Sequence, residues 1–181
     1  MTTPEPTGSR EPSGRSSTMT VLESVKDIEN LTLTITSEFE AGIERVWLLW
    51  TDPRRLERWW GPPTWPAAFE RHEPVEGGRS AYVMTGPGGE RARGWWRVTA
   101  VDEPTRFEFD DGFADDEGEP DDAMGITHAV VTLEEISSTR TRMTIRTRFE
   151  SAEQLEQMVE MGMEEGMRLA LGQIDPLLLE G

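Results

Sequence analysis

The chain has 181 residues and a formal charge of −17, from 35 acidic and 18 basic side chains. A field of that sign repels phosphate backbones and anionic lipid surfaces, so we expect neither nucleic-acid nor membrane binding. The lack of cysteine excludes disulfides, thiolate catalysis and iron–sulfur clusters.

The first 18 residues contain only Pro, Gly, Ser, Thr, charged residues and one Met. Such a segment buries too little apolar surface to offset its ordering entropy. We therefore predict a disordered tail over 1–18, a weak lead-in to about residue 30, and one ligand-binding domain over 31–181. Met19 is an alternative translation start to Met1. With no signal-peptide core or membrane span, we expect a cytoplasmic protein, and a monomer.

The domain begins with a strand, because apolar residues alternate with polar ones from Leu31 to Phe39. A helical pattern follows over 43–51, and Asp52 before Pro53 is typical of an N-cap that starts a second short helix. From 66 to 149, turn residues separate a run of apolar segments. The strands predicted there are 67–74, 79–85, 91–102, 105–111, 125–136 and 140–149.

Eight acids crowd residues 110–122, and we predict a mobile loop there between two strands. A calcium loop is excluded because the acids do not precede Gly112 or Gly118 at the required spacing. After residue 149 the period becomes helical. Ser151 and Gln154 form a capping box that starts one long amphipathic helix, which Pro176 kinks or ends. The fold class is therefore α+β: a curved antiparallel sheet around a long C-terminal helix.

Candidate ligand contacts come from aromatic and methionine residues. Of the seven tryptophans, Trp47 and Trp50 fit a helix core, whereas Trp59, Trp60 and Trp65 surround a Gly-Pro-Pro loop. These three either form the mouth of an apolar pocket or pack in the core.

In the last helix, Gly162 and Gly166 alternate with Met163 and Met167. This pattern either packs the helix closely on the sheet or leaves room for a ligand to which methionines adapt. The two histidines are too few for a zinc site, and His128 is either a pocket residue or a structural one. We expect no metal and no cofactor.

Three segments carry a resemblance to a known family: WTDPRRLERWWGPP, EPVEGGRSAYVM and GWWRVTAVDEPTRFEF. Over residues 31–180 the chain resembles the activator-of-Hsp90-ATPase-like branch of the START/SRPBCC superfamily. The resemblance implies a helix-grip fold, with about seven antiparallel strands around a C-terminal helix and a hydrophobic cavity between them.

Within that superfamily, the chain also resembles the self-sacrifice resistance proteins that protect producers of enediynes such as calicheamicin. That resemblance implies binding of the activated drug, donation of a hydrogen atom from a glycine, and cleavage of the backbone, which is consumption rather than enzymatic turnover. Gly112 is the candidate donor, since it follows Phe107 and Phe109 at a strand end; Gly118 and Gly125 are alternatives. The ligand contacts that we predict are Trp59, Trp60, Trp65, Met84, Trp96, Phe107, Phe109, His128, Met163 and Met167.

Two other functions remain open. A polyketide cyclase, aromatase or hydrolase would need an acid or base in the cavity, for which His72, Glu73, Tyr82 and His128 are the candidates. An interaction module of the Hsp90 co-chaperone type is the third hypothesis, although fold alone does not establish it.

Overall fold

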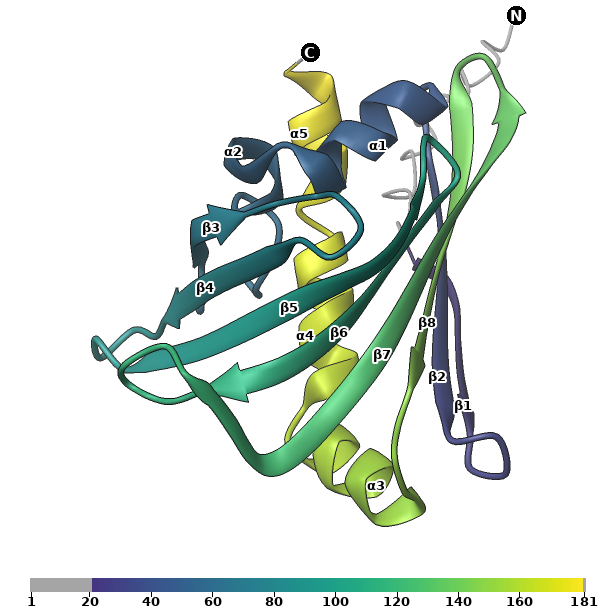
Figure 1. Cartoon of the computed structure of the whole chain (residues 1–181). Coiled ribbons are helices and arrows are strands. Elements are labelled where there is room, and N and C mark those ends of the chain that lie inside the picture. The colour runs from purple at the N-terminus through teal and green to yellow at the C-terminus, as the bar shows by residue number, and fades with distance from the viewer. Residues whose placement is uncertain (1–20, 181) are drawn as a thin grey trace, which may run out of the picture.

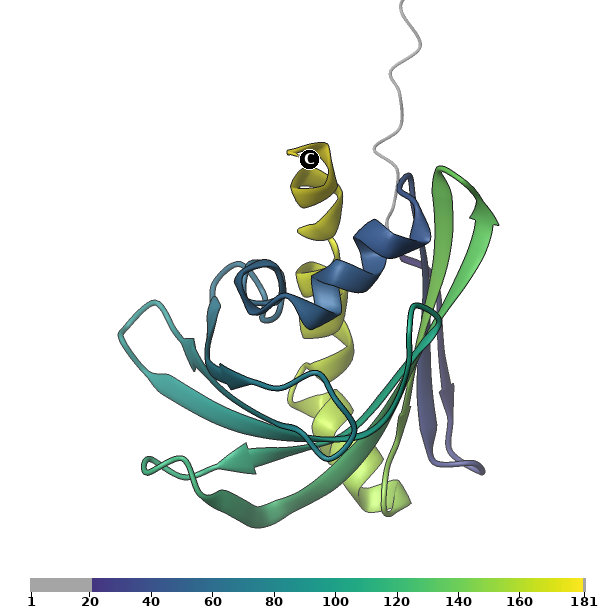
Figure 2. The same cartoon turned by 45° about the horizontal axis from the view of Figure 1, so that its top comes forward.

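A computed structural model of the chain describes residues 21–180 (Figure 1). The predicted tail over 1–18 lies outside the described residues. All eight strands form one antiparallel sheet in the order β1-β2-β8-β7-β6-β5-β4-β3. The sheet is strongly curved, and the helices lie across its concave side (Figures 1 and 2). We call the side facing the helices the inner face and the other side the outer face.

The elements follow in the order β–β–α–α–β×6–α–α–α. The strands are β1 (Val21–Asp27), β2 (Thr32–Phe39), β3 (Ala67–His72), β4 (Arg79–Thr85), β5 (Arg91–Asp102), β6 (Arg106–Ala114), β7 (Pro120–Ser137) and β8 (Arg140–Arg148). The helices are α1 (Ile43–Thr51), α2 (Pro53–Leu56), α3 (Ala152–Glu160), α4 (Met163–Leu171) and α5 (Ile174–Leu179).

The segment before residue 30, for which we predict only a weak lead-in, forms an additional strand, so the sheet has eight strands instead of about seven. β1 pairs with β2 and stands at the edge of the sheet. Its side chains are mostly exposed, including Leu22 and Val25, so it lacks the clean alternation that marks a half-buried strand. Backbone pairing, rather than burial, holds this strand in place.

Two helix starts are confirmed in atomic detail. The Asp52 side chain accepts a hydrogen bond from the Arg54 N–H at 3.0 Å, with Pro53 in the first turn of α2. The Ser151 hydroxyl accepts one from the Gln154 N–H at 3.1 Å. In return, the Gln154 side chain accepts from the Glu150 N–H and donates to the carbonyl of Met124 in β7. This side chain therefore joins the start of α3 to the sheet.

The prediction of one continuous C-terminal helix is wrong, because the segment forms three shorter helices. Gly162 has a φ of +92°, which ends α3 and begins α4 at a new angle. A second break separates α4 from α5 near Gly172, so Pro176 lies inside α5 instead of ending the helix. The acidic segment is also more ordered than predicted. β6 continues to Ala114 and β7 begins at Pro120, which leaves only a tight hairpin over 115–119.

Candidate functional site

Aromatic rings fill the part of the inner face that lies against α1 and α2. Trp60 and Trp96 have ring centroids 4.8 Å apart, and Trp96 stacks on Phe109 at 4.1 Å. The rings predicted to contact a ligand, Trp59, Trp60, Trp96, Phe107 and Phe109, are between 0 and 6% exposed. The structure therefore places these five in the core instead of at a pocket mouth.

A polar pair lies where the aromatic cluster ends. The Tyr82 hydroxyl in β4 donates a hydrogen bond to the Asp111 carboxylate in β6 at 3.1 Å. Asp111 shares the inner face with Phe107 and Phe109 because side chains two residues apart point the same way along a strand. Its neighbours across the sheet are Trp96 and Thr127, which carry no charge.

The surroundings of Tyr82 and Asp111 raise the pKa values of both side chains. Burial raises the pKa of Asp111 to about 7, although the hydrogen bonds from the Tyr82 hydroxyl and the Gly112 N–H, and the nearby Trp96 indole, act in the other direction. Burial, together with the nearby Asp111 carboxylate, raises the pKa of Tyr82 well above its ordinary value. A carboxyl that titrates near neutrality inside a fold is a common mark of a functional position.

Two buried donors also lie at this pair. The indole Nε1 atoms of Trp60 and Trp96 make no hydrogen bond of ordinary geometry among the described residues. Both indoles are close enough to lower the pKa of Tyr82 against the effect of burial. Unpaired buried donors are rare and costly, so this corner of the interior has hydrogen-bonding capacity that the protein itself leaves partly unused.

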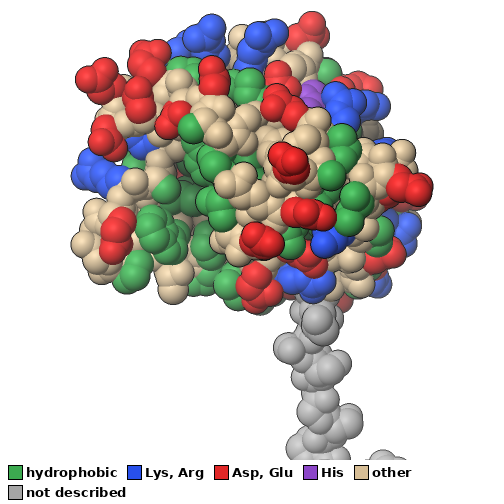
Figure 3. Space-filling model, turned by 90° about the horizontal axis from the view of Figure 1, so that it is seen from below, with side chains coloured by type: hydrophobic (Ala, Val, Ile, Leu, Met, Phe, Trp, Pro, Cys, Tyr) green, Lys and Arg blue, Asp and Glu red, His purple; other side chains and the backbone are tan. Residues whose placement is uncertain are grey.

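Beyond the polar pair, flexible side chains replace the rings. A set of half-buried residues from β4, β7, α3 and α4 packs against the core. We call it the methionine layer, and it consists of Met84, Met124, Val159, Met163 and Met167. Seen from below, hydrophobic side chains occupy the hollowed centre of the molecule, with acidic side chains around them (Figure 3).

The helix backbone leaves space beside this layer. Cβ atoms added to Gly162 or Gly166 would meet nothing within 4 Å. The reading in which these glycines serve close helix–sheet packing is therefore wrong. Trp65 lies half-buried at the margin, where its ring covers Gly86. Met84, Met163, Met167 and Trp65 are thus the predicted contacts that the structure leaves partly accessible.

Gly112 occupies the opposite face from the one required of a hydrogen donor to an interior ligand. It pairs with Trp95 across the β5–β6 ladder, and a Cβ built on it would lie 2.8 Å from the Trp95 ring. Trp95 points outward, since its neighbour Trp96 points inward. The Cα of Gly112 is thus covered from the outer side by an indole ring.

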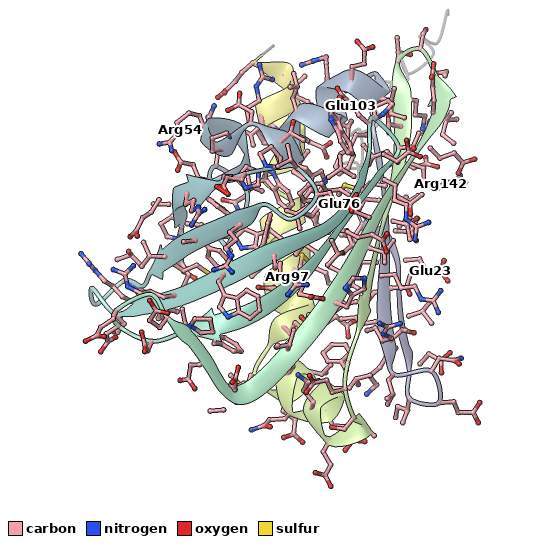
Figure 4. The ribbon with its side chains drawn as sticks, in the orientation of Figure 1. Glu23, Arg54, Glu76, Arg97, Glu103 and Arg142 are labelled. Carbon is pink, nitrogen blue, oxygen red and sulfur yellow. The ribbon has the colours of Figure 1, made fainter. Side chains whose placement is uncertain are left out.

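His128 also lies on the outer face. Its Nδ1 is 2.7 Å from the Asp110 carboxylate and its Nε2 is 3.5 Å from that of Glu108. It borders a shallow depression of about 320 Å³ that is lined by Arg106, Arg146 and Arg148 among others. Charged side chains project from this outer surface, Arg97 among them (Figure 4). His128 therefore does not line a pocket on the inner face, which the sequence left open as one of two possibilities.

Of the predicted acid–base candidates, only Tyr82 lies at the polar pair. His72 is held by the Ser80 hydroxyl and the Trp50 carbonyl, each at 2.7 Å, and Glu73 by Arg71 on the exposed edge. Sequence reasoning missed Asp111, because it stands within a run of acids that resembles a solvated loop. Its two-residue spacing from Phe107 and Phe109 was the signal that could have identified it.

Within residues 21–180, no group of three or more His, Asp or Glu side chains is placed to hold a metal ion. None of the described helices is long and apolar enough to cross a bilayer.

A curved antiparallel sheet closed by C-terminal helices, with a partly apolar interior, defines the helix-grip class of domain. Residues 40–178 match the family described as Activator of Hsp90 ATPase homolog 1-like protein, and the chain belongs to that family. No curated protein matches the chain.

Solved structures of bacterial proteins agree with this assignment. A protein from Arthrobacter aurescens, solved by NMR, is 58% identical over 90% of this chain and 94% of its own, with a TM-score of 0.86. A crystal structure from Mycobacterium smegmatis is 46% identical over 87% of this chain and 96% of its own, with a TM-score of 0.81. A protein from Staphylococcus epidermidis is 26% identical over 88% and 94%, with a TM-score of 0.77.

Proposed function

We propose that the protein binds a hydrophobic small molecule between the inner face of the sheet and the helices α3 and α4. The observation that carries the proposal is the change in packing along the inner face. Rigid, fully buried rings end at Trp96 and Phe109, and half-buried methionines with the Tyr82–Asp111 pair follow. Methionines adapt to irregular ligands, and a few polar groups in an apolar site fix ligand orientation.

The test is binding of a neutral hydrophobic fluorophore, N-phenyl-1-naphthylamine, whose emission rises in an apolar site. We expect saturable binding, and at least a tenfold loss of affinity in Met167→Glu, which places a charge in the methionine layer. Met161→Glu is the matched control, because Met161 is 62% exposed next to the same helix break. Loss of binding in neither variant, or equal loss in both, would contradict the proposed location.

A narrower version of this function follows from the resemblance to the enediyne resistance proteins. Here the ligand is a thiol-activated enediyne, and its diradical forms a C–H bond as a glycine Cα–H bond breaks. The Cα radical then reacts with dioxygen before the backbone is cleaved. Because the Trp95 ring covers Gly112 on the outer side, the donor in this version is Gly125, which adjoins Met124 of the methionine layer.

Intact-protein mass spectrometry after mixing with the activated drug tests this version. Two complementary fragments are expected, and their masses distinguish a junction at Gly112 from one at Gly125. A single unmodified mass, with the drug still cutting DNA, would remove the enediyne from consideration and leave the broader binding function untouched.

The polar pair favours one further candidate, an enzyme that transforms its ligand by acid–base chemistry. A carboxyl with a pKa of about 7 can both accept and return a proton at neutral pH. This candidate predicts many product molecules per protein molecule and intact protein afterwards, whereas self-sacrifice predicts one event each. Asp111→Asn would abolish turnover while retaining the hydrophobic binding.

A further inference from the structure

Asp111 lacks a cationic partner. Among residues 21–180 it forms no ion pair, and its one side-chain hydrogen bond of ordinary geometry comes from the neutral Tyr82 hydroxyl. By contrast, its sequence neighbour Asp110 lies on the outer face, where His128 contacts it. Asp111 is half-buried, and withdrawing a carboxylate from water without a counter-charge is costly. The interior would therefore gain from a positive charge that the protein does not itself supply.

The groups around Asp111 suit a cation better than an anion. Trp60 and Trp96 lie beside Tyr82, with ring centroids 6.0 and 6.1 Å from its ring, and aromatic rings attract ammonium groups. Tyr82 is the titratable side chain that bears on the carboxyl, and it stays neutral because its own pKa is raised. Within residues 21–180, no Arg, Lys or His side chain forms an ion pair with Asp111.

The approach to the methionine layer is acidic as well. Exposed carboxylates stand on the hairpin between β6 and β7 and on the helices α3 and α4, and red side chains surround the green hollow in Figure 3. They include Asp115, Asp116, Glu117, Glu119, Glu153, Glu156, Glu160 and Glu165. Such a field raises the local concentration of cations and lowers that of anions.

We propose that the ligand of this protein is a hydrophobic amine, which places its apolar body in the methionine layer and its ammonium group against Asp111. This inference rests on the proposed function, since it names the ligand class for the same site. A neutral ligand whose carbonyl accepts a hydrogen bond from protonated Asp111 is the competing outcome.

Three probes with one ring system separate these outcomes: 1-naphthylmethylamine, 1-naphthalenemethanol and 1-naphthoate. Affinities are measured by calorimetry at pH 6 and pH 8 on the full chain. We expect the amine to bind at least tenfold more tightly than the alcohol at pH 8, and the carboxylate to bind most weakly. Because the amine needs an ionised Asp111, its affinity should rise from pH 6 to pH 8 and its binding should release protons at pH 7. This readout needs no variant.

Asp111→Asn should then remove the preference of the protein for the amine, while Asp110→Asn, one residue away on the outer face, should preserve it. Circular dichroism checks that both variants fold. If the alcohol binds as tightly as the amine and Met167→Glu weakens both, the binding function stands and the amine inference fails. If none of the three probes binds, and the neutral fluorophore does not bind either, the proposed function and the inference fail together.

Discussion

Replacing Asp111 with Asn should change how the stability of the protein depends on pH. The Asp111 pKa rises from 3.8 in a model peptide to about 7 in the fold, because burial disfavours the charged form. The folded state therefore holds this proton more tightly than the unfolded chain. The stabilisation from this proton is complete below pH 3.8 and is lost as the pH rises through about 7.

The size of the effect follows from linkage. At about 1.4 kcal/mol per pKa unit, the shift amounts to roughly 4 kcal/mol over the whole titration. Between pH 5 and pH 8 the part lost is about 2.5 kcal/mol, and the partial exposure of the side chain reduces this to about 2 kcal/mol. The free energy of unfolding of the wild type, minus that of Asp111→Asn, should fall by this amount over the range.

Urea denaturation followed by tryptophan fluorescence at pH 5, 6, 7 and 8 measures both proteins. Taking the difference between them removes shared contributions. Glu73 and Glu108, whose pKa values are lowered, act mainly below pH 4.5, and half-buried His72, whose pKa is also lowered, acts below 6.5. Asp116→Asn in the exposed hairpin is the control and should parallel the wild type. A constant difference between wild type and Asp111→Asn from pH 5 to pH 8 would refute the interior assignment of this carboxyl.

Four other predictions concern three glycines and one histidine. Gly166→Ala should stabilise the protein by about 1 kcal/mol, because alanine favours the interior of α4 and its Cβ meets open space. Gly94→Ala should destabilise the protein by about 2 kcal/mol, because the new Cβ would lie 2.2 Å from the Tyr82 ring. Opposite signs in urea denaturation check both, and equal signs would contradict the packing. Gly112→Ala should cost about 1 kcal/mol through its contact with Trp95, and the cost should vanish in a Trp95→Ala background, as a double-mutant cycle would show. His72 should be neutral at pH 6.5, because burial lowers its pKa. Its single ring proton should sit on Nε2, because that atom donates to the Trp50 carbonyl. A doubly protonated ring in NMR spectra at that pH would contradict both expectations.

Local chemistry made much of the fold predictable from the sequence. Asp52 and Ser151 start helices through contacts with residues two or three positions away, so no knowledge of the tertiary structure is needed. Turns and alternating apolar residues placed β2 to β5 and β8 to within a few residues. The antiparallel sheet with C-terminal helices on one side then follows from short connections.

The parts that sequence reasoning missed depend on long-range pairing. β1 forms because β2 offers it a free edge, which its own exposed side chains do not reveal. β6 and β7 extend into the acidic segment because a turn closes between them: Gly118 has a φ of +83°, and the Asp115 side chain accepts from the N–H groups of Glu117 and Glu119. Acids that suggested disorder thus build the hairpin.

The candidate site was harder to predict for the same reason. Sequence reasoning made Gly112 the candidate hydrogen donor to the ligand because it follows Phe107 and Phe109, and left His128 as either a pocket residue or a structural one. The side that a strand residue faces depends on its place in the ladder, which the sequence alone does not set. Counting by twos from Phe107 and Phe109 places Asp111 inside and Gly112 outside. The predicted face of Met163 and Met167 depends on helical spacing alone, and both side chains do pack against the core.

The crowding of indole rings has a spectroscopic consequence. The Trp50 ring lies 4.8 to 6.2 Å from the rings of Trp59, Trp60 and Trp96, and the Trp60 ring lies 5.6 Å from Trp59 and 4.8 Å from Trp96, at fixed and mostly steep angles. Transition dipoles so close and so rigidly oriented couple into shared excited states, which produce a strong couplet in circular dichroism. Since Trp60 and Trp96 also border the Tyr82–Asp111 pair, a molecule that settles there perturbs the coupled set as a unit. The protein therefore carries a label-free optical reporter of its own interior, readable without any added dye.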